Sequence, residues 1–192
     1  MLTLYFSPGA SSMAPHIALY EVGAKFDTVV VSLRKGENST PGYLAINPEG
    51  KVPTLVIDGK PLTEVAAILY YLARRYPDAK LMPDDLVKQA EVVSWMSFVA
   101  ATVHPARRQG MQRWHEVFGI AEQRLGPHEW AVDNFSIADI HLFRLFWRYF
   151  NAVHPAAGTF PNLEAHYQRM LARPAVQRTC EVEAAIGYDL PV

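Results

Sequence analysis

The stretch FSPGASSMAPHIALYEVG (Phe6–Gly23) joins a short apolar segment to an amphipathic one through a Pro-Gly turn and two serines. The run LTLYF (Leu2–Phe6) is typical of a buried strand, and the segment after the serines predicts a helix that ends at Gly23. Hydroxyl groups at a strand-to-helix junction lie where helix amides can hold an anion. Ser11 and Ser12 are therefore candidates either for ligand binding or for capping the helix.

The rest of the N-terminal part alternates strands with helices. DTVVVSL (Asp27–Leu33) is rich in β-branched residues and predicts a strand. VPTLVIDG and KPLT predict a hairpin with Asp58-Gly59 as its turn, and EVAAILYYLARRY (Glu64–Tyr76) predicts a helix. The order β-α-β followed by β-β-α predicts an α/β domain with a four-stranded mixed sheet.

The composition changes at PDAKLMPDD (Pro77–Asp85), where two prolines and four charges predict a linker. The sequence after it predicts only helices. Their expected ranges are Leu86–His104, Ala106–Leu125, Ser136–Val153, Asn162–Leu171 and a shorter one near Ala175–Glu183. The expected organisation is therefore a domain over residues 1–77, a linker over 78–85 and an all-α domain over 86–192.

One helix start is marked unusually clearly. In NFSIADI, the hydroxyl of Ser136 can cap a helix amide while the carboxylate of Asp139 reaches back to the Ser136 amide. Such a capping box predicts where the helix begins and carries no chemistry of its own.

The composition restricts the class of protein. The 192 residues are 50% hydrophobic and 19% charged, as in an ordinary globular protein, and the net charge of -1 favours neither nucleic acid nor an anionic membrane. The most apolar segment, Val92–Val103, is too short to cross a bilayer, and the N-terminus does not resemble a signal peptide. The single cysteine, Cys180, indicates a reducing, cytoplasmic setting. The histidine spacing predicts no metal site.

Two further phrases are candidate ligand sites. In GKVPTL, a cis bond before Pro53 would leave the peptide groups of Val52 free to pair with an extended ligand, and a trans bond at an edge strand is the alternative. In LTEVAAIL, Glu64 stands at a helix start, where a ligand carboxylate can bind the Val65 amide while Glu64 takes an ammonium group. Alternatively, Glu64 only complements its own helix dipole.

Together these phrases resemble the glutathione transferase family, nearest to the bacterial beta class. The matching pieces are LYFSPGASSMAPHIAL, AINPEGKVPTL, LTEVAAILYYLARRYP, FSIADI and FPNLEAHYQRMLARPAV, which follow one another over nearly the whole chain. The resemblance implies a thioredoxin-like N-terminal domain that binds glutathione and a helical C-terminal domain that lines the second-substrate pocket. It also implies a homodimer, a role in detoxification and a cis bond before Pro53.

The resemblance also implies roles for particular residues. Val52 would hold the cysteinyl backbone of glutathione, Glu64 and Val65 its γ-glutamyl end, and Lys35 its glycyl carboxylate. His104 falls where this group has a histidine near the thiol. Two departures stand out, because Ser11 replaces the usual cysteine and Val65 replaces the usual serine. The first disfavours mixed-disulfide chemistry, and the second removes a hydrogen bond worth about 1.5–3 kcal/mol.

The expected activity is attack of the glutathione thiolate on a small apolar electrophile. A free thiol has a pKa of about 8.5, and a serine hydroxyl together with a helix N-terminus can lower it. Ser11 is the first candidate for that donor and Ser12 the second, while helix capping by both is the alternative. His104 is a candidate base, or satisfies backbone freed by Pro105. The candidate lining of the electrophile pocket is Met13, Trp95, Phe98, Met111 and Trp114, which are equally typical of a plain core.

Two other functions remain open from the sequence. Val65 and the absent cysteine also fit a non-catalytic binding protein on this fold, since fold alone does not determine function. A glutathione-dependent isomerase would use the same activated sulfur but release a product without glutathione.

Overall fold

The computed structural model describes residues 1–188 and divides the chain into two compact units, each described separately below. The first unit comprises Met1–Arg75 and the segment from Pro174 onward, and the second comprises Tyr76–Arg173. The elements of the first unit are β1 (Leu2–Phe6), α1 (Met13–Glu21), β2 (Asp27–Val30), η1 (Glu37–Ser39), α2 (Pro41–Leu44), β3 (Thr54–Ile57), β4 (Lys60–Thr63), α3 (Val65–Arg75) and α9 (Pro174–Ile186).

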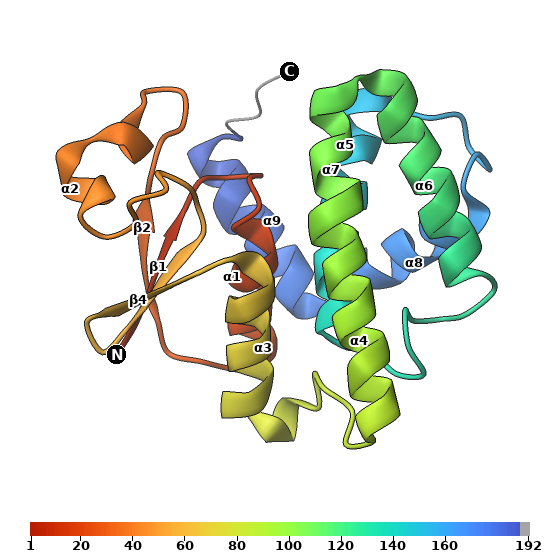
Figure 1. Cartoon of the computed structure of the whole chain (residues 1–192), viewed down its shortest axis with the longest axis horizontal. Helices are drawn as coiled ribbons and strands as arrows, with labels where there is room; N and C mark the ends of the chain where they lie inside the picture. Colours follow the sequence, from red (N-terminus) through yellow and green to blue (C-terminus); the bar gives the residue numbers. More distant parts are fainter. Residues whose placement is uncertain (189–192) are drawn as a thin grey trace. The chain divides into compact units, whose positions relative to one another are not determined.

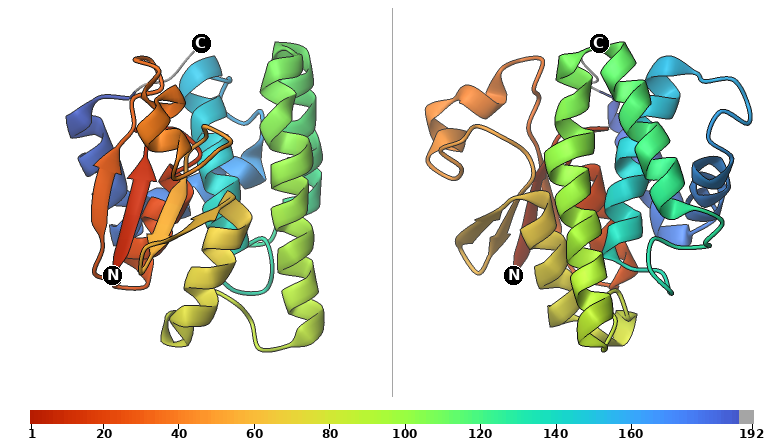
Figure 2. Two further views of the ribbon diagram at one scale, coloured as in Figure 1. Left: turned by 60° about the vertical axis from the view of Figure 1, so that its left-hand side comes forward. Right: turned by 45° about the vertical axis from the view of Figure 1, so that its right-hand side comes forward.

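The strands form one four-stranded mixed sheet in the order β2-β1-β3-β4, which confirms the predicted fold. Strand β1 pairs in parallel with β2 and antiparallel with β3, and β3 pairs antiparallel with β4. Figure 2 shows β1 with β2 and β3 at its two sides. Helices α1 and α3 pack against each other, and α2 lies apart from them on the other side of the sheet (Figure 1).

Alternating burial along β1 explains why this strand lies at the centre of the sheet. Leu4 and Phe6 are fully buried, whereas Thr3 and Tyr5 point to the opposite face and are half-buried. Strand β2 ends at Val30, three residues before the predicted end at Leu33. It is an exposed strand at the edge of the sheet, next to β1. Edge strands in proteins are often short.

Helix α9 corrects the predicted domain organisation. The sequence placed residues 86–192 together in the helical domain, but α9 packs against α1 of the first unit (Figure 1). The apolar positions Ala175 and Val176 are buried there, together with Thr179 and Glu183. Helix α9 is also 13 residues long and so not the short helix expected.

The second unit contains helices and helical turns and no strand among its described residues, as predicted. They are η2 (Pro77–Ala79), α4 (Leu86–Phe98), the π-helical turn η3 (Val99–Val103), α5 (His104–Ala106), η4 (Arg107–Gln109), α6 (Met111–Leu125), α7 (Ile137–Val153) and α8 (Pro161–Leu171). The capping box at the start of α7 is present: Ser136 Oγ accepts from Ala138 N at 3.2 Å, and Ser136 N donates to Asp139 Oδ2 at 2.9 Å.

The predicted helices Leu86–His104 and Ala106–Leu125 place a helix break at Pro105, but the structure has the break at another residue. The helical path runs through His104 and Pro105, because the preceding turn Val99–Val103 widens to a π-helix. A π-helical turn can accommodate the carbonyl that proline leaves without a partner. The path breaks instead at Gly110, whose φ of 113° and ψ of 165° are open to glycine, so the predicted helix Ala106–Leu125 begins only at Met111.

No helix within the described 188 residues is long and apolar enough to cross a membrane.

Candidate active site

The register of the sheet brings three loops to one edge. Tyr5 at the end of β1 pairs with Thr54 at the start of β3, and Thr54 pairs with Thr63 at the end of β4. Neighbouring strands lie about 4.8 Å apart, so the segments that follow or precede these residues are adjacent. This edge gathers the segments that contain Ser11, Ser12, Val52, Pro53, Glu64 and Val65.

The loop before β3 contains the cis peptide bond Val52-Pro53 that the resemblance implied. Val52 lies outside the strand, and neither its N–H nor its C=O bonds to any residue between 1 and 188. An extended backbone can therefore pair with Val52 as an additional strand would.

A small set of buried side chains fixes this loop. The Tyr43 hydroxyl donates to the Lys51 carbonyl at 2.5 Å and lies 3.1 Å from Thr54 Oγ1. The Asn47 amide donates to the same two oxygens, at 2.8 and 3.1 Å. Burial raises the pKa of Tyr43 above its usual value, so the hydroxyl stays protonated. We call Tyr43, Asn47 and Thr54 the loop brace. The sequence analysis missed it, although Asn47 lies within the phrase AINPEGKVPTL.

Glu64 holds a backbone conformation that is unusual for its residue type. Its φ is 68°, in the left-handed region, and its side chain is exposed. The Ile68 amide is the first to bond within the helix, at 3.0 Å to the Glu64 carbonyl, so the Val65, Ala66 and Ala67 amides are at the open N-terminus of α3. The positive electrostatic potential at the N-terminus of α3 thus lies beside the exposed Glu64 carboxylate. This arrangement suits a ligand group that carries both a carboxylate and an ammonium.

Ser12 stabilises the loop between β1 and α1. Its hydroxyl donates to the Ser7 carbonyl and accepts from the Ser7 amide, both at 3.1 Å, and it is fully buried. It occupies the N-cap position of α1 but makes no side-chain capping bond. Helix capping by this hydroxyl, one of the alternatives, is therefore wrong for Ser12.

Ser11 is available for a ligand. It is half-buried, and its hydroxyl forms no hydrogen bond with any part of the chain that the structure describes. Its carbonyl accepts from Ala14 N at 3.3 Å, which fixes the backbone of the loop while leaving the side chain unconstrained. Of the two serines, only Ser11 has a hydroxyl that is not already committed to the fold.

The loop is also held from α9. Glu183, fully buried, accepts from the Gly9 amide at 2.6 Å and lies 2.9 Å from His16 Nδ1 on α1. Gly9 has a φ of 73°, so a residue with a side chain would be strained there. The sequence analysis missed the contact between His16 and Glu183 because the two residues are 167 positions apart in the chain.

Two other predicted residues lie outside this cluster of loops. Lys35 is exposed in the turn after β2, where its amide donates to Ser32 Oγ at 3.3 Å. Since β2 is parallel to β1, this turn follows the sheet edge that the candidate site uses. His104 belongs to the second unit, where it is exposed on α5.

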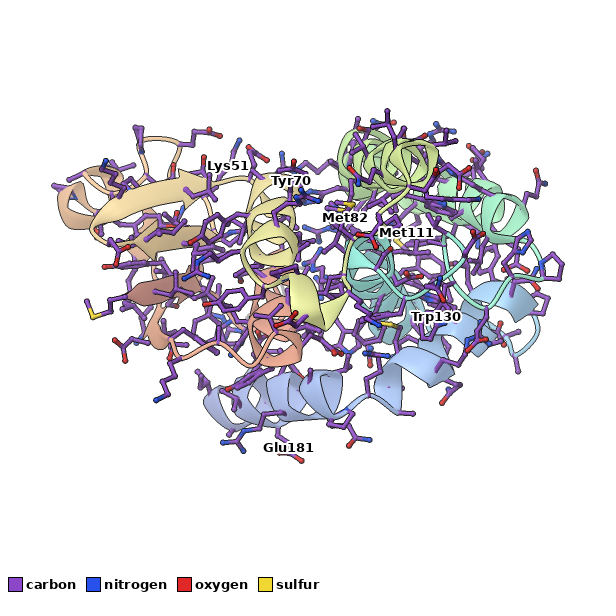
Figure 3. All side chains as sticks on the ribbon, turned by 90° about the horizontal axis from the view of Figure 1, so that it is seen from below. Lys51, Tyr70, Met82, Met111, Trp130 and Glu181 are labelled. Atoms are coloured by element: carbon purple, nitrogen blue, oxygen red, sulfur yellow. The ribbon has the colours of Figure 1, made fainter. Side chains whose placement is uncertain are left out.

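The residues predicted to line an electrophile pocket have different environments. Met13 is fully buried on α1 of the first unit. In the second unit, Trp95 is buried under the guanidinium of Arg124, 4.3 Å from its ring, and contacts Phe98 at 5.9 Å between ring centres. Trp114 is buried, and its Nε1 forms no hydrogen bond within residues 1–188. Met111 (Figure 3) is 55% exposed.

Cys180 is half-buried on α9, and burial, followed by the charge of Glu183, raises the pKa of its thiol to about 11. A thiol with that pKa is a poor nucleophile. Among the described residues, no group of His, Cys, Asp or Glu side chains is arranged to hold a metal ion.

Comparison with known proteins places the chain in a family. Residues 1–74 match the family model "Glutathione S-transferase, N-terminal domain", and residues 93–174 match "Glutathione S-transferase, C-terminal domain". The chain is 32% identical to glutathione S-transferase GstA of Escherichia coli O157:H7, over 95% of this chain and 98% of that protein. It belongs to the glutathione S-transferase family.

Solved structures agree with this assignment. A beta-class glutathione S-transferase of Sphingomonas chungbukensis is 35% identical, with a TM-score of 0.84 over 94% of this chain and 98% of that one. A sphingomonad glutathione S-transferase complexed with glutathione is 32% identical, with a TM-score of 0.83 over 95% and 98%.

Proposed function

We propose that the protein transfers the thiolate of glutathione to a small apolar electrophile, and that it is a beta-class enzyme with serine in place of the usual cysteine. The observation that carries the proposal is the meeting, at one sheet edge, of the unpaired Val52 peptide, the α3 N-terminus beside Glu64 and the free Ser11 hydroxyl. The sphingomonad relative that was solved with glutathione supports the choice of ligand.

Each part of glutathione has a matching group. The cysteinyl N–H and C=O pair with the backbone of Val52, and the γ-glutamyl carboxylate binds the open amides of α3 while Glu64 takes its ammonium. Lys35 is the candidate for the glycyl carboxylate. Val65 offers its amide and no hydroxyl, so we expect weaker binding of the γ-glutamyl end than serine would give.

The reaction begins with loss of the thiol proton to water. The Ser11 hydroxyl donates a hydrogen bond to the resulting thiolate, which lowers the thiol pKa because the bond is stronger to the anion. The sulfur electron pair then forms a C–S bond. Either a leaving group departs with its bonding pair, or the carbanion formed by addition to a double bond takes up a proton.

We also propose that the enzyme forms a homodimer. Apolar side chains are exposed on helix α4, where Leu86, Val87 and Val93 are 78%, 65% and 50% exposed. Tyr70 on α3 (Figure 3) is 51% exposed. Exposed apolar side chains grouped on a helix are typical of an association surface.

The test is a pH titration of the ultraviolet thiolate absorbance of bound glutathione. We expect a thiol pKa below the free value of about 8.5, and a rise of about one unit in Ser11→Ala. Ser39→Ala, at an exposed serine of the same unit, is the control and should not change it. A depressed pKa that Ser11→Ala leaves unchanged would refute the role of Ser11, and no binding at millimolar glutathione would refute the proposed function.

Product analysis separates the alternatives. A product that retains glutathione identifies a transferase, whereas an isomerised product without glutathione identifies an isomerase. A depressed thiol pKa also excludes a binding protein that lacks an activating site.

A further inference from the structure

The candidate active-site loop is anchored by a residue from a distant part of the chain. Glu183 on α9 accepts a hydrogen bond from the Gly9 amide at 2.6 Å, and Gly9 lies two residues before Ser11. Helices α1 and α9 lie side by side (Figure 1), and all of these residues belong to the first unit. Glu183 is fully buried, although glutamate is almost never buried unless it is paired. A buried carboxylate beside this loop is a costly feature that calls for an explanation.

The position of the carboxylate is fixed by His16 on α1. His16 Nδ1 lies 2.9 Å from Glu183 Oε1, and because a carboxylate only accepts hydrogen bonds, Nδ1 is the donor. The other ring nitrogen, Nε2, forms no hydrogen bond within residues 1–188, so Glu183 is the polar contact that orients the ring. Three aromatic rings surround the imidazole, with ring centres 5.0, 5.2 and 5.9 Å away: Phe6, Tyr20 and Phe26. The second carboxylate oxygen, Oε2, is thereby held towards the Gly9 amide.

Hydrogen bonds within the loop connect this anchor to Ser11. The Ala10 amide donates to the Ser7 carbonyl, and the Met13 amide donates to the Ala10 carbonyl, both at 3.0 Å. The Ser11 carbonyl accepts from the Ala14 amide at 3.3 Å. Because the Ser11 hydroxyl bonds to no residue that the structure describes, its position depends on the backbone of the loop. A contact that fixes this backbone therefore also fixes the place of the hydroxyl.

We infer that Glu183 is a positioning residue for thiol activation: through Gly9 it holds the loop so that the Ser11 hydroxyl is directed at the sulfur of bound glutathione. This inference rests on the proposed transferase function and extends it to a residue of the last described helix. A hydrogen bond stabilises a thiolate only when its donor lies at a suitable distance and angle, and a donor that is held in advance needs no reorientation. Glu183 acts through Ser11 and does not touch the ligand.

The first test measures the thiol pKa of bound glutathione, from its ultraviolet thiolate absorbance, in a double-mutant cycle. Glu183→Ala should raise this pKa by at least about half a unit, in the same direction as Ser11→Ala. The double variant should have the same thiol pKa as Ser11→Ala alone, because Glu183 acts through that hydroxyl. Glu183→Gln should restore a pKa close to that of the wild type, since its amide oxygen can accept from Gly9 while its amide nitrogen faces His16.

A second buried position on α9 provides a control for lost stability. Thr179 is fully buried, and its hydroxyl donates to the Ala175 carbonyl of the same helix at 2.9 Å. Thr179→Ala should destabilise the fold without raising the thiol pKa, because this hydrogen bond lies within α9 and not at the loop. If Glu183→Ala does not fold, Glu183→Asp takes its place. Its carboxylate keeps the charge but is one methylene closer to the backbone, so it no longer reaches both Gly9 and His16.

The second test needs no glutathione. Hydrogen exchange followed by mass spectrometry reports how readily the amides of residues 7–13 open in the free protein. We expect this segment to exchange about tenfold faster in Glu183→Ala than in the wild type, because the Gly9 amide loses its acceptor. Exchange in Glu183→Gln should match the wild type, since glutamine also offers an acceptor.

The outcomes separate this inference from the proposed function. A depressed thiol pKa that is equal in wild type and Glu183→Ala would overturn the role of Glu183 and retain the transferase. Rises in Ser11→Ala and Glu183→Ala that add in the double variant, equal rises in Glu183→Ala and Thr179→Ala, or unchanged exchange of residues 7–13 would also overturn it. No binding at millimolar glutathione would refute the transferase function and with it the role in thiol activation, whereas faster exchange in Glu183→Ala would then retain only the anchoring of the loop.

Discussion

His16 on α1 and Glu183 on α9 form a fully buried contact, with Nδ1 2.9 Å from Oε1. The second carboxylate oxygen of Glu183 accepts from the Gly9 amide in the loop that carries Ser11. One side chain thus ties the last described helix both to the first helix and to the candidate active-site loop.

We expect Glu183→Ala to lower the free energy of unfolding by about 3–5 kcal/mol, because it removes a buried carboxylate that bonds both an imidazole nitrogen and a backbone amide. Urea denaturation measures the loss. Glu181→Ala is the matched control: Glu181 lies on the same helix, its side chain is 69% exposed, and its ion pair with Arg178 should contribute under about 1 kcal/mol. Equal losses in the two variants would contradict a specific role for the buried contact.

The loop brace makes a separate prediction about ligand binding. Tyr43→Phe removes the hydroxyl that bonds the Lys51 carbonyl and Thr54 Oγ1, on either side of Val52-Pro53. We expect stability to fall by about 1–1.5 kcal/mol and glutathione to bind several-fold more weakly, since the Val52 peptide is less well positioned.

Calorimetry with glutathione and urea denaturation measure the two effects of Tyr43→Phe. Tyr70→Phe, which removes a hydroxyl from an exposed tyrosine on α3, should change neither. The proposed role of the brace is wrong if glutathione affinity stays the same in Tyr43→Phe.

The two serines are expected to respond differently to truncation. Ser12→Ala removes the buried hydroxyl that accepts from the Ser7 amide and donates to the Ser7 carbonyl. We expect the free energy of unfolding to fall by about 1–3 kcal/mol. Ser11→Ala removes a hydroxyl without a partner in the fold and should change stability by under about 0.5 kcal/mol. Thermal or urea unfolding of the two variants checks this, and a larger loss in Ser11→Ala would reverse the assignment.

Local patterns in the sequence were sufficient to predict most of the fold. β-Branched runs, the Asp58-Gly59 turn and the Ser136 capping box each act over a few residues, and the structure has the corresponding strands, hairpin and helix start. The break expected at Pro105 was misplaced because a π-helical turn beside it, which no short pattern announces, keeps the helical path intact.

The long-range contacts were not predictable in this way. Helix α9 was assigned to the wrong unit because its amphipathic pattern indicates a buried face but not the partner of that face. The site residues at the sheet edge were candidates from local patterns, but their roles toward one ligand were proposed from a family resemblance. The Glu183–Gly9 bond and the loop brace depend on tertiary contacts and appeared only in the structure.

His141 should make stability depend on pH. Its pKa is about 3 in the folded protein, against a usual value of 6.5, so it stays neutral when the unfolded chain takes up a proton. The contribution of the neutral His141 to the free energy of unfolding is complete above pH 6.5 and is lost as the pH falls towards 3. Between pH 7 and pH 5 we expect it to account for about 2 kcal/mol of lost stability.

Urea denaturation at pH 7 and pH 5 tests this for the wild type and His141→Leu. The leucine variant should lose about 2 kcal/mol less between the two pH values than the wild type does. His128→Leu, at an exposed histidine of the same unit, should behave as the wild type. An identical pH dependence in His141→Leu and wild type would contradict the assignment.

Val65 offers a gain-of-function test of the γ-glutamyl position. It is the first residue of α3 and 9% exposed, and its side chain carries no hydroxyl. Val65→Thr keeps the branched shape and adds a hydroxyl beside the open amides, so we expect glutathione to bind about ten- to a hundredfold more tightly. Calorimetric titration of the wild type and the variant measures the gain. Val65→Ala is the control, because it changes the same side chain without adding a hydroxyl, and it should not tighten binding. If alanine and threonine improve affinity equally, the added hydroxyl is not the cause, and the γ-glutamyl group does not lie against this helix start.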